Sequence, residues 1–180
     1  MSPKIPKATL AVFLLTCLMT GMQFFFPALV GALERTPGML SSGQWWRLIT
    51  PILINPEGWR QIASNLLGIA IVGTVVERLF GSGRWLGLYL AGAIVGELTG
   101  LVWQPEGAGS SVAICGLLGG LTAWLMWRAK PIQPRVGGAI LILGALVLTA
   151  MRDIHGPAIV AGACAAAVML SRDARVSPSE

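Results

Sequence analysis

Two serines and the only histidine of this chain stand where apolar stretches begin, and they are the residues best suited to chemistry. Ser110 and Ser111 open a stretch that continues to Gly120, and His155 opens another. A serine hydroxyl becomes a useful nucleophile when a neighbouring neutral imidazole accepts its proton. The pattern therefore indicates a Ser–His nucleophilic pair. The alternative at this point is a pair of core polar groups that only satisfy each other.

The composition is that of a membrane protein. Of the 180 residues, 54% are hydrophobic and 12% are charged, and the mean hydropathy is +0.72; ordinary soluble domains are about one quarter charged. Apolar runs of about 20 residues cross a bilayer core, and six occur, at about 8–30, 60–80, 85–103, 110–127, 136–151 and 155–171. We therefore expect an all-α membrane protein, a six-transmembrane-helix bundle over residues 8–171, with a basic tail at 1–7 and a polar tail at 172–180.

The formal charge of +5 follows the expected topology. With six spans, one side of the membrane holds nine basic residues and the other side holds four. The nine are Lys4, Lys7, Arg78, Arg84, Arg128, Lys130, Arg135, Arg172 and Arg175, and the four are Arg35, Arg47, Arg60 and Arg152. Cytoplasmic loops carry such an excess. Both termini are therefore expected in the cytoplasm, and no nucleic-acid partner is needed to explain the charge.

This topology brings polar side chains to one depth. Spans that begin at the outer face place Gln61, Asn65, Ser111 and His155 within their first one or two turns, on the order of 3–10 Å along the axis. Polar groups at such depth in a membrane are costly and indicate a site. The small-xxx-small spacing that starts at Gly116 lets two membrane helices approach closely, so a partner helix is expected beside the serines.

Over roughly residues 43–170 the sequence resembles the rhomboid intramembrane serine proteases. No single motif is specific, but their order, spacing and expected topology match the family together. The matching residues are Trp46-Arg47 in the first outer loop, Asn65, Gly73-xxx-Glu77-xxx-Gly81, Gly109-x-Ser111 followed by Gly116, and His155 followed by Ala158 and Gly162. The resemblance implies a six-helix core that cleaves membrane-associated substrates, with a water-filled cavity opening outward between the long first loop and the second and fifth spans.

The resemblance also implies roles for single residues. Ser111 would attack the peptide bond, and His155 would act as general base and then as acid to the leaving amine. Ser110 is the rival nucleophile by adjacency, although its neighbour has the better spacing to the glycines that follow. The resemblance assigns oxyanion or substrate binding to Asn65, Gln61 and Ser110. It assigns structural roles to Trp46, Arg47, Glu77, Gly116 and Gly162. It implies no metal or other cofactor.

Two carboxylates lie near these residues. Glu97 falls inside an expected span, where an acidic group must face protein or water. Asp153 lies two residues before His155, so on a helix its side chain would point away from the imidazole. The sequence therefore favours a Ser–His dyad over a triad.

Two positions depart from the family pattern. The second span of the family usually reads His-x-x-x-Asn, but Gln61 occupies the first position, and the residue after the serine is usually Gly but here is Val112. A glutamine amide still donates a hydrogen bond, whereas a branched side chain beside the nucleophile would narrow the substrate cleft or shift the close packing. Because Ser111 and His155 are both present, we expect a working protease.

Two other functions are weighed against this one. A rhomboid-like pseudoprotease would bind transmembrane proteins without cutting them, but its signature is the loss of the serine or the histidine. A small transporter needs a polar path through the whole membrane, whereas the polar residues here gather in the outer half. The expected partners are a transmembrane protein substrate and the lipid bilayer, the expected location is a prokaryotic cell (inner) membrane, and the oligomeric state is left open.

Overall fold

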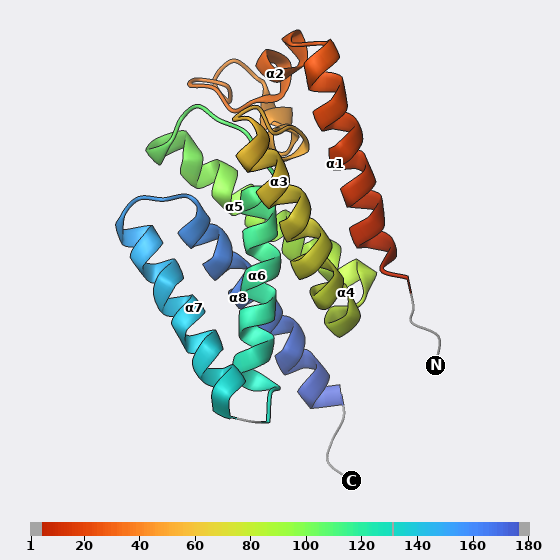
Figure 1. The fold of residues 1–180 in the computed structure, drawn as a ribbon. Helices are drawn as coiled ribbons and strands as arrows, with labels where there is room; N and C mark the ends of the chain where they lie inside the picture. The colour runs from red at the N-terminus through yellow and green to blue at the C-terminus, as the bar shows by residue number, and fades with distance from the viewer. Residues whose placement is uncertain (1–4, 131, 177–180) are drawn as a thin grey trace.

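The structure is a computed structural model that describes residues 5–130 and 132–176. Over these residues it consists of helices and loops, with one isolated bridge between Arg35 and Gly107. The long helices pack into one bundle, with α6 between α5, α7 and α8 (Figure 1). The elements are α1 (Lys7–Phe25), α2 (Ala28–Leu33), η1 (Trp45–Leu48), η2 (Thr50–Leu53), α3 (Trp59–Gly68), η3 (Ile69–Gly73), α4 (Thr74–Phe80), α5 (Ser82–Trp103), α6 (Ser111–Trp127), α7 (Ile132–Ala150) and α8 (His155–Val176).

Within the described ranges, five helices are long and apolar enough to cross a membrane. They are Lys7–Phe25, Trp59–Phe80, Ser82–Trp103, Ile132–Ala150 and His155–Arg175. The second is the continuous run of α3, η3 and α4, in which η3 is a π-helical turn. The remaining expected span corresponds to α6, an apolar helix of 17 residues. The all-helical expectation is thus confirmed, and five of the six expected spans have spanning length.

Two expected boundaries differ from the structure. The span expected over 8–30 breaks after Phe25, because Pro27 disfavours a helical conformation at the residue before it; Phe26 has φ −129° and ψ 77°, and α2 starts afterwards. At the other end, α8 continues through the first part of the expected polar tail, where Asp173 pairs with Arg84 of α5 at 2.6 Å. Residues 1–4 and 177–180 of the expected tails lie outside the described residues.

Glu77 joins three helices at one end of the bundle. Its carboxylate accepts hydrogen bonds from the backbone N–H groups of Ala8 and Thr9, at 2.9 and 2.7 Å, and from the Ser82 hydroxyl at 2.6 Å. First-turn N–H groups have no acceptor within their own helix, so Glu77 supplies acceptors for α1 while holding the start of α5. In Figure 1, α1 begins and α8 ends toward this end, and α2 lies at the opposite one.

Glycines let α6 pack in backbone contact with α5 and α8. A Cβ atom on Gly116 would collide with the carbonyl oxygen of Leu88 in α5, and one on Gly162 of α8 would collide with the carbonyl oxygen of Gly116. A Cβ atom on Gly119 would likewise collide with the carbonyl oxygen of Ile159 in α8. Membrane helices associate through such close packing, since lipid offers no hydrophobic driving force between them. The spacing noted in the sequence therefore corresponds to helix contacts on two sides of α6.

Gly162→Ala tests this packing. The added methyl group must push α8 away from α6, and overpacking costs about 1–3 kcal/mol, so the midpoint of thermal unfolding in detergent should fall. The matched control is Gly144→Ala in α7, where nothing lies within 4 Å of the added Cβ. Its midpoint should equal or slightly exceed that of the wild type, because alanine is the better helix former. Equal midpoints for the two variants would contradict the close approach.

Candidate active site

The hydroxyl of Ser111 and the imidazole of His155 are in direct contact. Ser111 Oγ lies 2.9 Å from His155 Nε2, and each residue is the first of its helix, α6 and α8 respectively. Both side chains remain partly accessible. The contact exists because the two helices meet through Gly116 and Gly162, which lie a few residues further along them. The packing of the bundle therefore places this pair.

The loop before α6 reaches Ser111 through a conformation that favours glycine. Gly109 has φ +144°, and a Cβ atom on it would lie 2.7 Å from Nε2 of Gln61. Its N–H donates to the carbonyl oxygen of Pro51 at 2.9 Å, which ties this loop to η2. A side chain at this position would both strain the backbone and displace the neighbouring amide.

Ser110 has different surroundings from its neighbour. Its side chain is fully buried, and its Oγ finds no hydrogen-bond partner among the described residues. Of the two candidate nucleophiles, Ser111 is the one whose hydroxyl lies against the imidazole of His155.

Asp153 contacts His155, so the expectation that it points away is wrong. Its Oδ1 lies 2.6 Å from His155 Nδ1 and accepts a hydrogen bond from the backbone N–H of His155 at 2.9 Å. The expectation assumed a helical position, but α7 ends at Ala150 and α8 begins only at His155. Asp153 therefore lies in the connection between helices, where its side chain turns back over the first residue of α8.

The carboxyl group of Asp153 is held in its ionised form. Partial burial raises its pKa, but hydrogen bonds from the backbone and side chain of His155, together with the positive charge that this histidine can bear, lower the pKa below the usual 3.8. A carboxyl with a lowered pKa contributes stability above its ordinary pKa of about 4 and loses it as the pH falls through the lowered value. At neutral pH Asp153 thus presents a negative charge to Nδ1.

Gln61 bridges the two loops that lead into the site. Its Oε1 accepts from the N–H of Glu57 at 3.0 Å, and its Nε2 donates to the carbonyl oxygen of Ala108 at 2.8 Å. An amide nitrogen carries two donors, so one N–H of Gln61 remains beyond this bridge. The Gln61 side chain therefore connects the segments of Glu57 and Ala108, and it keeps one N–H that can donate to another acceptor.

Asn65 belongs to a buried chain of amides that the sequence did not indicate. Its Nδ2 donates to Oδ1 of Asn55 at 2.6 Å. Asn55 is fully buried. Its backbone N–H donates to the side-chain oxygen of Gln23, and the side-chain nitrogen of Gln23 donates back to the Asn55 carbonyl oxygen. Its Nδ2 donates to the hydroxyl of Thr20 in α1. The available signal was a lone polar residue directly after the apolar run Ile52–Ile54. This chain fixes the orientation of Asn65.

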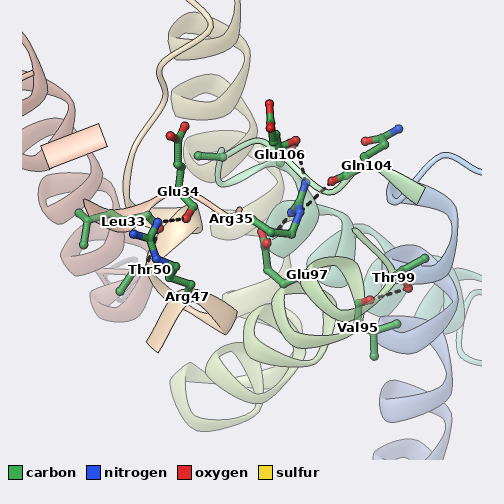
Figure 2. A network of polar contacts seen from close by, with 12 residues as sticks. Leu33, Glu34, Arg35, Arg47, Thr50, Val95, Glu97, Thr99, Gln104 and Glu106 are labelled. Atoms are coloured by element: carbon green, nitrogen blue, oxygen red, sulfur yellow. Dashed lines mark hydrogen bonds and ion pairs between the residues drawn. The ribbon is translucent and has the colours of Figure 1, made fainter. Parts of the chain in front are cut away.

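Arg35 anchors the loop that leads to Ser111, and it too was missed. Its guanidinium forms a buried ion pair with Glu97 of α5 at 2.5 Å, and it donates to the carbonyl oxygens of Gln104 at 2.9 Å and Glu106 at 3.4 Å (Figure 2). The α5 backbone makes room for it at Gly100, where a Cβ atom would lie 2.5 Å from the guanidinium carbon. The expectation that Glu97 faces protein or water is confirmed, and the group that it faces is the Arg35 guanidinium. The available signal was Glu97 itself, because an acidic side chain within a membrane span is costly unless it pairs with another polar group.

Arg47 lies in η1, within the loop between α2 and α3, and its partners belong to that loop and to α2. It donates to the side chain of Gln44 and to the backbone carbonyl oxygens of Glu34 and Gly31 (Figure 2 shows the contact with Glu34). Its side chain is buried, whereas the neighbouring Trp46 is mostly exposed and donates to the carbonyl oxygen of Ala32 at 3.5 Å. Both residues therefore hold the loop onto the α2 segment.

Val112 packs against α5, with space provided by a glycine. Its side chain is 1% exposed, and a Cβ atom on Gly96 would lie 2.6 Å from the Cβ of Val112. The branched side chain thus occupies room that Gly96 leaves open. This arrangement answers the concern that Val112 disturbs the packing beside the nucleophile.

An open groove of about 490 Å³ runs past the Ser–His pair. Its lining is Glu57, Arg60, Gln61, Ser64, Asn65, Ser111 and His155. A smaller cavity of about 90 Å³ shares Gln61, Ser111 and His155 with this groove and includes Arg35, Glu97 and Val112 in its lining. The four polar residues expected at one depth therefore share one groove. Its walls come from α3 and the segment before it, and α7, the expected fifth span, contributes no lining residue among those described.

The arrangement of this site agrees with a family assignment from sequence. The model of the Rhomboid domain family matches residues 42–172, which takes in η1, η2, the residues that line the groove and both members of the Ser–His pair. The chain belongs to the rhomboid family. With its five helices of spanning length in the described ranges, this rhomboid protein is a multi-pass integral membrane protein.

Several curated proteins are similar to this rhomboid chain. Rhomboid protease GluP of Bacillus subtilis (strain 168) is 40% identical over 114 residues, which is 63% of this chain and 22% of that protein. YdcA of the same bacterium is 33% identical over 96 residues, covering 52% of this chain and 48% of its own length. RHOMBOID-like protein 5 of Arabidopsis thaliana is 30% identical over 110 residues, which is 56% of this chain and 35% of that protein. The match spans less than half the length of each of these relatives.

Proposed function

We propose that this protein is an intramembrane serine protease that cleaves membrane-anchored protein substrates near the outer face of the membrane. The observation that carries the proposal is the 2.9 Å contact between Ser111 Oγ and His155 Nε2 beside an open groove. Membership of the rhomboid family and similarity to a protein named rhomboid protease GluP support the same class of reaction. A hydroxyl with a base at hydrogen-bond distance is the arrangement that nucleophilic catalysis needs.

The proposal includes a topology with six spans and both ends of the chain in the cytoplasm of a prokaryotic cell. In support, α1 begins and α8 ends at the same end of the bundle (Figure 1), and the basic residues gather on the side assigned to the cytoplasm. A helix of about 20 residues spans the bilayer core, and α6 has 17. If α6 ends level with its neighbours on the cytoplasmic side, Ser111 lies below the outer surface, within reach of a substrate helix.

The proposed reaction proceeds in two steps. Ser111 Oγ attacks the peptide carbonyl carbon while its proton passes to Nε2 of His155, and the tetrahedral adduct then expels the amine, which takes that proton. Water next attacks the acyl-enzyme ester, His155 accepts the water proton, and Ser111 regains a proton as the new carboxyl product leaves. The groove supplies the water, because Glu57 and Arg60 line it and are exposed.

Three groups are proposed to stabilise the oxyanion. The backbone N–H of Ser111 lies in the first turn of α6 and has no acceptor within its helix. The second N–H donors of the Gln61 and Asn65 amides lie nearby: a Cβ atom on Gly109 would be 2.7 and 3.5 Å from their nitrogens. The Ser110 hydroxyl, expected from the sequence to bind oxyanion or substrate, is not among these groups, because Ser110 is fully buried and does not line the groove.

Ser111→Ala should abolish cleavage of a single-span model substrate in proteoliposomes, with kcat reduced by at least about 10⁴-fold because nucleophile and base act as one unit. The matched control is Ser110→Ala, which removes the adjacent hydroxyl and should retain most of the wild-type rate. Thermal unfolding midpoints should show that both variants fold. An inactive Ser110→Ala beside an active Ser111→Ala would reverse the assignment. A wild type that binds the substrate without cleaving it would establish the pseudoprotease alternative instead.

Asn65→Ala should lower kcat by about 10²–10³-fold with little change in KM, as the loss of one oxyanion donor does. Its control is Ser64→Ala, which alters the neighbouring groove-lining residue, whose exposed hydroxyl donates to the backbone carbonyl oxygen of Gln61, and which should keep close to the wild-type turnover. Gln61→Ala should show the same fall if its free N–H binds the oxyanion, and Gln61→His should be tolerated. Wild-type turnover in Gln61→Ala would limit Gln61 to bridging the loops.

A further inference from the structure

The backbone between α7 and α8 fixes the position of Asp153. α7 ends in a Schellman motif, in which the N–H of Arg152 donates to the carbonyl oxygen of Thr149 at 3.0 Å and that of Asp153 to Leu148 at 2.9 Å. Arg152 takes the left-handed conformation, φ +59°, that this motif requires and that glycine usually occupies. Asp153 therefore stands at one defined place, two residues before His155.

The carboxylate of Asp153 receives two hydrogen bonds from the same residue. Oδ1 accepts the backbone N–H of His155 and lies 2.6 Å from its Nδ1. The opposite ring nitrogen, Nε2, faces Ser111 Oγ at 2.9 Å. A carboxylate only accepts hydrogen bonds, so the contact at Nδ1 places the proton on Nδ1 and leaves the Nε2 lone pair toward the serine hydroxyl.

We propose that Asp153 is a positioning residue that completes a Ser111–His155–Asp153 triad, holding the imidazole in the tautomer and orientation that accept the serine proton. This inference rests on the proposed protease function. In the acylation step the serine proton moves to Nε2, and the resulting imidazolium keeps its Nδ1 proton, which remains hydrogen-bonded to the ionised carboxylate. Asp153 takes up no proton, and its charge stabilises the cation beside it.

A simpler role for Asp153 must be separated from this one. An aspartate just before a helix caps first-turn N–H groups and interacts favourably with the helix dipole, and Asp153 does accept the N–H of His155. Asparagine and serine cap about as well as aspartate. Neither carries the negative charge at Nδ1, so Asp153→Asn and Asp153→Ser preserve the cap while removing the proposed function. Asp153→Ala removes both.

The first measurement compares kcat, KM and thermal unfolding among these variants and the wild type. Asp153→Asn and Asp153→Ser should lower kcat by at least about 10-fold, with KM and the unfolding midpoint close to those of the wild type. The fall should stay below the ~10⁴-fold loss of a fully buried triad carboxylate, because Asp153 and His155 are 36% and 35% exposed and water replaces part of the contact. Wild-type kcat in both cap-competent variants, with a lowered midpoint in Asp153→Ala alone, would reduce Asp153 to a helix cap.

The second measurement does not depend on cleavage. His155 is the only histidine, so protein purified without a histidine tag and labelled on histidine nitrogens gives NMR signals from this imidazole alone. The wild type should show the tautomer with the proton on Nδ1, and Asp153→Asn and Asp153→Ser should lose that preference. A proton on Nε2 in the wild type, or an unchanged tautomer in both variants, would overturn the inference. An inactive wild type with the expected tautomers would refute the proposed protease and leave the positioning of His155 by Asp153 intact.

Discussion

Backbone contact between α6 and its two neighbours is the constraint on which the site depends. Gly116 lies against the α5 backbone on one side and receives Gly162 of α8 on the other. Because these positions have no side chains, α6 and α8 approach until Ser111 and His155, at the starts of the two helices, come within 2.9 Å. A catalytic hydrogen bond tolerates displacements of only about 0.5 Å, so a side chain at either glycine would change the chemistry from several residues away.

Buried polar contacts then hold the segments that approach Ser111. Arg35 pairs with Glu97 and holds the loop before α6, while Asn55 holds the amide of Asn65. Removing one member of a buried ion pair costs about 3–5 kcal/mol because the partner charge is left uncompensated. Such contacts fix the segments that border the groove, and preorganised donors stabilise developing charge without reorganising during the reaction.

The sequence predicted what depends on hydropathy and spacing, and failed where contacts join distant or irregular segments. Apolar runs located the helices, and the small-residue pattern at Gly116 indicated the close packing beside Ser111. The Arg35–Glu97 pair joins residues 62 positions apart, and no local pattern encodes such a contact. Asp153 was misjudged because helical geometry was applied to a residue that lies between helices. Val112 was interpreted without Gly96, whose missing side chain accommodates it; both residues must be considered together.

The most direct test of the central claim is peptide mapping by mass spectrometry after treating the purified wild-type protein with a serine-directed fluorophosphonate. The reagent modifies the serine whose hydroxyl is activated by a neighbouring base. The account predicts a single adduct on Ser111, formed only in the folded protein and lost when His155 is replaced by alanine. An adduct on Ser110, or a preparation that cleaves its substrate while Ser111 stays unmodified, would contradict it.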